Sequence, residues 1–150
     1  SAQDTFISSA YWTEKTGTAA AIKTLEIMEK IKSWKIISKI GTDISNKWKD
    51  LANENNLKIS ISGLSSIKSF KIDSKDWIKY KTFIAQEMLK KGFLATSTIY
   101  TCVEHKKKIL DRYYNELNKI FKIIGDCEKG KSIDEKLEVP LCQSSFQRLN

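Results

Sequence analysis

Side chains able to act as catalytic bases or nucleophiles are few and scattered in this sequence. His105 is the only histidine, so a Ser–His or Cys–His catalytic pair would have to use it as the base. It lies between Glu104 and the run Lys106–Lys108, a position more typical of the start of a surface helix. The sequence therefore does not indicate a self-contained active site, and no catalytic residue is assigned within it.

Metal and phosphate motifs are also missing from the sequence. Cys102, Cys127 and Cys142 are widely separated and lack the C-x-x-C spacing of a zinc or redox site, so we expect reduced thiols. No set of ligands has the spacing of a metal site, and no glycine-rich phosphate loop is present. The adjacent carboxylates Asp134 and Glu135 are expected to be solvated charges in a polar tail. We therefore expect no metal.

Hydroxyl groups are concentrated at the start of the sequence, just before an alanine-rich helical pattern. They belong to Thr5, Ser8, Ser9, Thr13, Thr16 and Thr18. Hydroxyls and backbone amides that precede a helix can bind an anion. Segments rich in Ser and Thr are more often simple loops, so this pattern alone is a weak signal.

Composition and charge restrict the class of protein. The 150 residues, 41% of them hydrophobic, are sufficient for one domain with an ordinary core. The net charge is +8, but among the 26 basic residues only Arg112 and Arg148 are arginine, the residue best suited to nucleic acid, so nucleic-acid binding is not favoured. No apolar run approaches the roughly 20 residues of a membrane span. The first residues do not resemble a signal peptide, so we expect a cytoplasmic protein.

Four helices are predicted from apolar residues that recur at intervals of three and four. The first covers residues 18–32, and the second begins at Ser33, a candidate cap, and ends near Leu51. The third begins near Trp77 after candidate caps at Asp73, Ser74 and Asp76, and it ends before Gly92, which is placed as a C′ glycine. The fourth runs from about Lys106 to Ile124.

Three strands are predicted between these helices, over residues 57–62, 67–72 and 93–100. Two adjacent strands followed by helix, strand and helix favour an α+β fold. We expect a small, mostly antiparallel three-stranded sheet covered by helices on one face.

Several segments resemble class III aminotransferases, most closely the branch related to glutamate-1-semialdehyde aminomutase. The resemblance begins with Asp4-Thr5-Phe6-Ile7-Ser8-Ser9-Ala10-Tyr11-Trp12-Thr13-Glu14-Lys15, followed by Gly17 and Ala19–Leu25. Similar segments follow in order at Ile59–Leu64, Glu87–Ala95, His105, Val139–Cys142 and Phe146–Leu149. The similarity therefore covers nearly the whole chain.

The resemblance implies a C-terminal part of a fold type I enzyme that uses pyridoxal phosphate. Residues 1–17 would end a strand of the large domain and form a phosphate-facing loop, residues 18–32 would form a linking helix, and residues 33–150 would form the C-terminal small domain. The cofactor would be joined to a lysine upstream of Ser1, so no lysine of this chain is assigned that role. The missing initiator Met fits a piece of a longer protein, which is expected to be inactive alone.

The resemblance also implies one cofactor contact in this chain. The family loop aligned with Ser8, Ser9 and Ala10 reaches the cofactor phosphate of the neighbouring subunit, usually through a threonine. Ala10 has no hydroxyl, so the backbone amides of Ser9 and Ala10, or the hydroxyls of Ser8 and Ser9, would make the contact. The implied partners are a second subunit in a homodimer and a small-molecule amino donor or acceptor.

Two other classes of function stay open. A free-standing basic α+β module could bind single-stranded RNA, with strand aromatics such as Phe70 stacking on the bases. A structural or dimerisation domain would need no active site. A fragment of an enzyme, in contrast, should expose apolar surface and self-associate.

Overall fold

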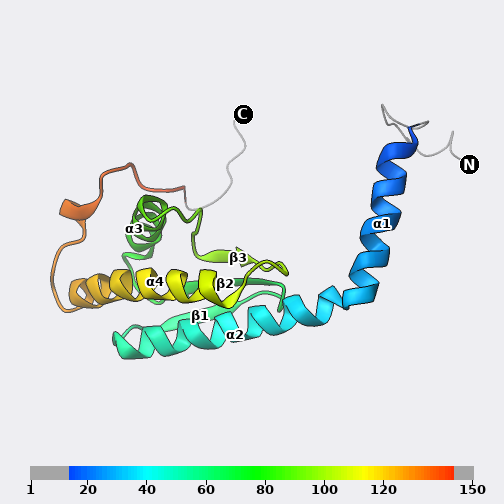
Figure 1. Ribbon diagram of the computed structural model, residues 1–150. Helices are drawn as coiled ribbons and strands as arrows, with labels where there is room; N and C mark the ends of the chain where they lie inside the picture. Colours follow the sequence, from blue (N-terminus) through cyan, green and yellow to red (C-terminus); the bar gives the residue numbers. More distant parts are fainter. Residues whose placement is uncertain (1–13, 144–150) are drawn as a thin grey trace, which may run out of the picture. The chain divides into compact units, whose positions relative to one another are not determined.

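The computed structural model describes residues 14–143 and separates the chain into two compact units, Ser1–Trp34 and Lys35–Asn150. The helices are α1 (Lys15–Ile31), α2 (Ser33–Glu54), α3 (Trp77–Lys90) and α4 (Lys107–Glu128). The strands are β1 (Ile59–Ser62), β2 (Ile67–Ile72) and β3 (Thr98–Tyr100), and a short 3-10 helix, η1, covers Asp134–Lys136. Figure 1 shows these elements along the chain. In the described range, no helix is both long and apolar enough to cross a membrane.

Helix α1 matches the first predicted helix to within a few residues. Lys32 caps its C-terminal end, and the left-handed backbone of this residue (φ 50) turns its amide back to the carbonyl oxygens of Met28 and Glu29. No residue of α1 is buried, so its apolar side chains are exposed: Ile22, Leu25, Ile27, Met28 and Ile31. The capping role predicted for Ser33 is wrong, because its buried Oγ neither donates nor accepts a hydrogen bond in the described part of the chain.

The three strands form one antiparallel sheet in the order β1-β2-β3. Ile61 of β1 pairs with Phe70 of β2, and Ile67 of β2 pairs with Tyr100 of β3. Since the order of strands follows the sequence, β3 is an edge strand.

Phe70 is at the centre of the core, where the sheet meets the helices. Its ring makes edge-on contacts with Trp48 of α2 (4.8 Å), Phe121 of α4 (5.6 Å) and Trp77 of α3 (6.3 Å). The opposite face of the sheet carries mostly polar side chains, including Ser60, Ser62, Ser69 and Lys71. The predicted α+β fold, with a small antiparallel sheet covered by helices on one face, is confirmed.

The third predicted strand is the least accurate element. Residues 93–97 are not in a strand, and β3 contains only Thr98–Tyr100. Gly92 has the positive φ (79) expected of a C′ glycine, and the Phe93 amide still donates to the Met88 carbonyl oxygen at the end of α3. Residues 93–97 therefore carry the chain from the helix end to the sheet.

The C-terminal strap, residues 133–142, packs along α3. The side-chain amide of Gln86 donates to the Lys136 carbonyl oxygen (2.9 Å) and accepts from the Glu138 amide (2.8 Å). The Thr82 hydroxyl accepts from the Cys142 amide (2.9 Å). Gln86 and Thr82 are buried polar residues of α3. The strap supplies hydrogen-bond partners for their side chains, which the apolar core side chains could not provide.

Candidate functional site

The sequence-predicted cofactor contacts, Ser8, Ser9 and Ala10, lie outside the described residues. Their role in binding phosphate stays a prediction. Among the hollows that the described residues form, one lies beside β3 and another lies between α3 and the end of α4.

The first, which we call the β3 hollow, has a volume of about 500 Å³ and lies against the edge strand. Its walls come from the segment that links α3 to β3, from β3 and from the first turns of α4. The apolar and aromatic lining consists of Phe93, Leu94, Ala95, Ile99, Tyr100, Ile109, Leu110 and Tyr113. Leu94 is 96% exposed and Tyr100 is 71% exposed, so the hollow opens onto an apolar surface.

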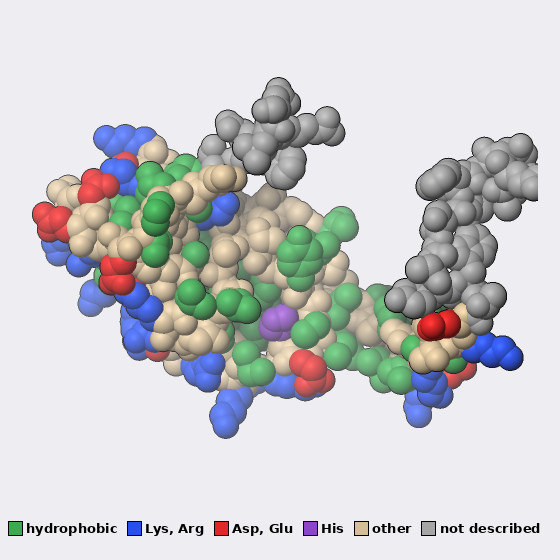
Figure 2. Space-filling view, turned by 90° about the horizontal axis from the view of Figure 1, so that it is seen from above, with side chains coloured by type: hydrophobic (Ala, Val, Ile, Leu, Met, Phe, Trp, Pro, Cys, Tyr) green, Lys and Arg blue, Asp and Glu red, His purple; other side chains and the backbone are tan. Residues whose placement is uncertain are grey.

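His105 lines the same hollow, immediately before α4. Its Nδ1 accepts a hydrogen bond from the Cys102 amide (2.9 Å), so the neutral ring carries its proton on Nε2. Figure 2 shows this imidazole, the chain's one histidine, in purple among green hydrophobic side chains. The sequence interpretation of a histidine at a helix start is confirmed, and the ring retains Nε2–H as a donor.

Arg112 contacts Phe93, a wall of the β3 hollow, but is not among the residues that line the hollow. Its guanidinium carbon lies 4.6 Å from the centroid of the Phe93 ring, a cation–π contact with a wall of the hollow. The sequence analysis singled out Arg112 only as one of two arginines. Its spacing of three residues from Ile109 places these two side chains on neighbouring positions of α4.

The floor of the hollow is rigid. Tyr113 is buried, packs edge-on against Phe93 (ring centroids 5.9 Å apart), and accepts a hydrogen bond from Trp48 Nε1 (3.0 Å). Burial raises the pKa of Tyr113, so it stays a neutral phenol. With its mostly apolar lining and no carboxylate or lysine in it, the β3 hollow is suited to binding an apolar group.

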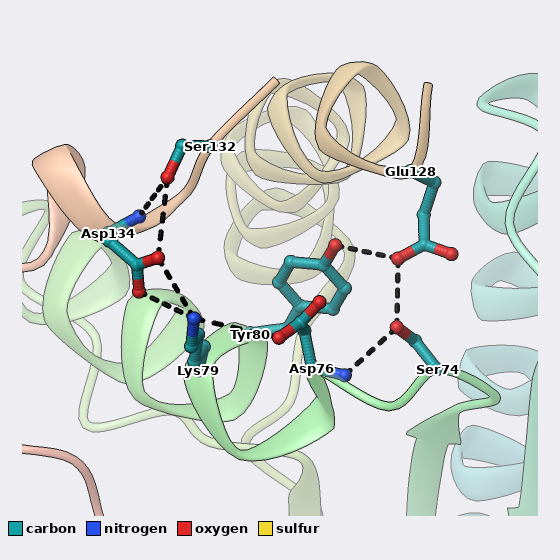
Figure 3. Close-up of polar contacts among 7 residues, drawn as sticks. All are labelled: Ser74, Asp76, Lys79, Tyr80, Glu128, Ser132 and Asp134. Atoms are coloured by element: carbon teal, nitrogen blue, oxygen red, sulfur yellow. Dashed lines mark hydrogen bonds and ion pairs between the residues drawn. The ribbon is translucent and has the colours of Figure 1, made fainter. Parts of the chain in front are cut away.

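The second hollow, of about 550 Å³, borders a network of polar side chains that we call the Glu128 cluster. Glu128, at the end of α4, accepts hydrogen bonds from Tyr80 Oη (2.6 Å) and Ser74 Oγ (2.8 Å). Ser74 Oγ also accepts a hydrogen bond from the Asp76 backbone amide (3.2 Å). The side chain of Asp76, the residue just before α3, makes no capping hydrogen bond. Figure 3 shows these groups converging from α3, α4 and the turn between β2 and α3.

An ion pair lies next to this network. Lys79 Nζ lies 2.7 Å from Asp134 Oδ1 and 3.6 Å from Asp76 Oδ1. The hydrogen bond to Asp134 is the main reason that the pKa of Lys79 is raised, and the same bond lowers the pKa of Asp134. The expectation that Asp134 is merely solvated is therefore wrong, because this carboxylate joins the strap to α3.

The Glu128 cluster is arranged for stability. Partial burial, followed by the hydrogen bond to Glu128, raises the pKa of Tyr80, so Tyr80 acts as a hydrogen-bond donor and not as an acid. Glu128 and Asp134 each already accept two or more hydrogen bonds from the chain itself. The cluster therefore joins α3, the end of α4 and the strap.

The structure also corrects the proposed mode of RNA binding. Phe70 is only 2% exposed and is enclosed by Trp48, Trp77 and Phe121, so it cannot stack on a base. Among residues 14–143, no group of His, Cys, Asp and Glu side chains is placed to hold a metal ion.

Comparison with protein-family models finds no match, and comparison with the curated proteins finds no similar sequence. Among the solved structures, the chain is similar to the FumI protein of Sphingopyxis sp. MTA144, determined in its pyridoxal phosphate internal aldimine form. The match has a TM-score of 0.74 with 16% sequence identity, and it covers 91% of this chain. It covers 33% of the FumI chain, so this chain spans about a third of that protein. The helices and sheet described above are thus a fold that FumI contains as one part of a larger chain.

Proposed function

We propose that this chain is the small-domain part of an enzyme that uses pyridoxal phosphate to move amino groups. The similarity to one third of the FumI chain is the observation that carries the proposal, since FumI binds pyridoxal phosphate in its solved structure. The ordered resemblance to class III aminotransferases extends the proposal to the branch related to glutamate-1-semialdehyde aminomutase. A homodimer and a small-molecule amino donor and acceptor belong to the same proposal.

The described residues do not form a complete cofactor site by themselves. The β3 hollow has no lysine in its lining, and in the second hollow Lys75 and Lys131 share the lining with the carboxylates Asp73, Asp76 and Glu128, which disfavour a phosphate. A site for pyridoxal phosphate would therefore need residues outside the described range, including a lysine from an upstream domain. When bound, the cofactor supplies the electron sink for chemistry at the amino-bearing carbon.

The residues of this chain would then position and enclose the reactants. The apolar and aromatic wall of the β3 hollow would face the reactants, and the hydrogen bond from Trp48 to Tyr113 holds the floor of that hollow in place. The exposed apolar side chains of α1 would provide contact area for the rest of the enzyme.

The test is the intact mass of the natural polypeptide, followed by its visible absorbance after purification. A longer chain with an upstream domain and bound pyridoxal phosphate would support the proposal, and borohydride reduction should fix the cofactor on an upstream lysine. The 150-residue chain, mixed with pyridoxal phosphate, should transfer no amino group. A natural chain that begins at Ser1, or a longer one that fails to bind the cofactor, would contradict the proposal.

A further inference from the structure

We propose that α1 pairs side by side with α1 of a second copy of this chain, in antiparallel orientation. The proposal goes beyond the proposed function, which assigns no interface between copies. It concerns a surface that the 150-residue chain contains by itself, and in a longer polypeptide an upstream domain would compete for the same surface. The occupant is a second copy because this surface is complementary to itself in shape and in charge.

The pairing surface is one stripe along α1. Side chains three and four residues apart share a face of a helix, and this spacing gives a stripe of Thr18, Ala21, Ile22, Leu25 and Met28. Leu25 is 64% exposed and Ile22 is 54% exposed. No residue of α1 is buried in the described structure. A helix with such a stripe gains stability when another element covers it.

The stripe changes from small to large side chains along the helix. Thr18 and Ala21 are near its start, and Leu25 and Met28 are near its end. In an antiparallel pair, Ala21 faces Leu25 of the second copy, and Thr18 faces Met28. Each layer then combines a small side chain with a large one, which fills the space between the helices. A parallel pair would place identical side chains opposite one another and leave a gap between the two alanines.

Charged residues on one flank of the stripe also match the antiparallel orientation. Lys15, Ile22 and Glu29 are spaced by seven residues, so they lie on the same flank. Antiparallel pairing brings Lys15 of each copy to Glu29 of the other, with the two Ile22 side chains in contact between the two ion pairs. In a parallel pair, Lys15 and Glu29 would stay fourteen residues apart, roughly 21 Å along the axis, where salt screens their attraction.

The net charge of the chain favours the same orientation. Each copy carries a net charge of +8, so two copies repel each other at long range. In an antiparallel pair, the two chains continue beyond α1 from opposite ends of the pair, whereas in a parallel pair both continue from the same end. The antiparallel orientation therefore separates the like charges.

Charge reversal tests the orientation, with sedimentation velocity at physiological salt as the measurement. K15E and E29K each place like charges opposite one another in the antiparallel pair. Each should therefore raise the dissociation constant of the dimer roughly fivefold. An equal mixture of the two variants restores opposite charges, as does the double variant K15E/E29K. Both should dimerise like the unmodified chain.

E54K is the matched control, because it makes the same change of charge at an exposed residue of α2 and should leave the dimer unchanged. Both reversals in α1 suit the helix macrodipole, since they put an acid in the first turn and a base in the last turn. A weaker helix would therefore not account for a loss of dimer, and circular dichroism checks that the helix content is kept.

Two adjacent residues test the apolar stripe. M28E should abolish the dimer, because its carboxylate would lie in the apolar contact. Ile27 is also exposed (48%) but lies on the opposite side of α1 from Leu25, so I27E should leave the dimer intact.

Three outcomes would overturn the proposal: a chain that is monomeric at every concentration, equal effects of M28E and I27E, or a mixture of K15E and E29K that dimerises no better than either variant alone. None of these outcomes concerns pyridoxal phosphate, so the proposed function is tested separately.

Discussion

The hydrogen bond between Trp48 and Tyr113 joins α2 to α4 inside the core. Trp48 is fully buried and Tyr113 is 5% exposed, so neither polar group can turn to water if the other is lost. Tyr114, the next residue, also packs edge-on against Tyr113 (5.5 Å), but it is only half-buried. The hydroxyl of Tyr113 is therefore a hydrogen-bond acceptor inside the core, whereas Tyr114 is partly open to water.

Y113F should lower the free energy of unfolding by about 1–3 kcal/mol, because it leaves the Trp48 N–H buried without an acceptor. Urea denaturation followed by circular dichroism measures this change. Y114F is the control and should change stability by less than about 0.5 kcal/mol. Equal effects of the two substitutions would contradict the structural role of the Trp48–Tyr113 bond.

The ion pair between Lys79 and Asp134 makes the attachment of the strap depend on pH. Asp134 has a pKa below its ordinary value of 3.8, because Lys79 bonds to its charged form. A lowered pKa in the folded state means stability that is present above the ordinary value and is lost as the pH falls through the folded value.

D134N should therefore be less stable than the unmodified chain at pH 7, and the difference should shrink as the pH falls below about 3.8. Urea midpoints at several pH values measure it. E135Q, which changes the neighbouring exposed carboxylate, should follow the unmodified chain throughout. A stability difference for D134N that stays constant down to acid pH would show that the ion pair is not its source.

At the scale of elements, α2 lies unusually close to the turn between β1 and β2. A Cβ placed on Gly41 would come 1.6 Å from the Ser65 carbonyl oxygen. The Thr101 hydroxyl lies within hydrogen-bond distance of the carbonyl oxygens of Ile37 (3.1 Å) and Ser66 (3.0 Å), so it joins the same helix and turn. Gly41 is therefore required by close backbone contact.

G41A should destabilise the chain by about 1–3 kcal/mol, since an added methyl group must displace backbone. Thermal unfolding measures the loss. Gly17 in α1 is the matched control, because nothing lies within 4 Å of its added Cβ. G17A should raise the helix content seen by circular dichroism, as alanine is the better helix former. A neutral G41A would mean that α2 can move away from the turn.

Periodicity predicted the four helices well, because each buries an apolar stripe, apart from α1, which keeps its stripe exposed. It failed for residues 93–97, because an apolar run does not reveal whether its side chains face a core. Phe93 packs on Tyr113, whereas Leu94 is almost fully exposed. The strap was described only as an irregular tail, since Gln86 and Thr82 hold its backbone and leave no pattern in its side chains.

The candidate site was harder to predict than the fold. His105 was recognised as a surface residue before a helix, but its neighbours Phe93 and Tyr100 come from a segment interpreted wholly as strand. A hollow forms where three segments meet, and sequence spacing within one segment cannot specify that meeting. Only the shared face of Ile109 and Tyr113, four residues apart on α4, was accessible from periodicity.

At the scale of the whole molecule, the chain should associate through α1. Leu25 is 64% exposed on a helix that buries none of its residues. L25E should shift sedimentation toward the monomer, because a charge in an apolar contact is costly to desolvate. Leu64, 72% exposed in the turn between β1 and β2, is the control, and L64E should leave association unchanged. A chain that stays monomeric at every concentration would contradict the prediction.

The strap has a consequence for how this fold can diverge. Gln86 and Thr82 recognise main-chain groups at Lys136, Glu138 and Cys142, and any amino acid except proline offers the amide that Glu138 and Cys142 contribute. Outside the buried Ile133 and the ion-paired Asp134, substitutions along the strap are therefore tolerated as long as Gln86 and Thr82 on α3 are kept. A lineage could exchange much of its C-terminal sequence and retain the same architecture, and two such proteins would be recognisable as kin by shape long after their sequences had ceased to align.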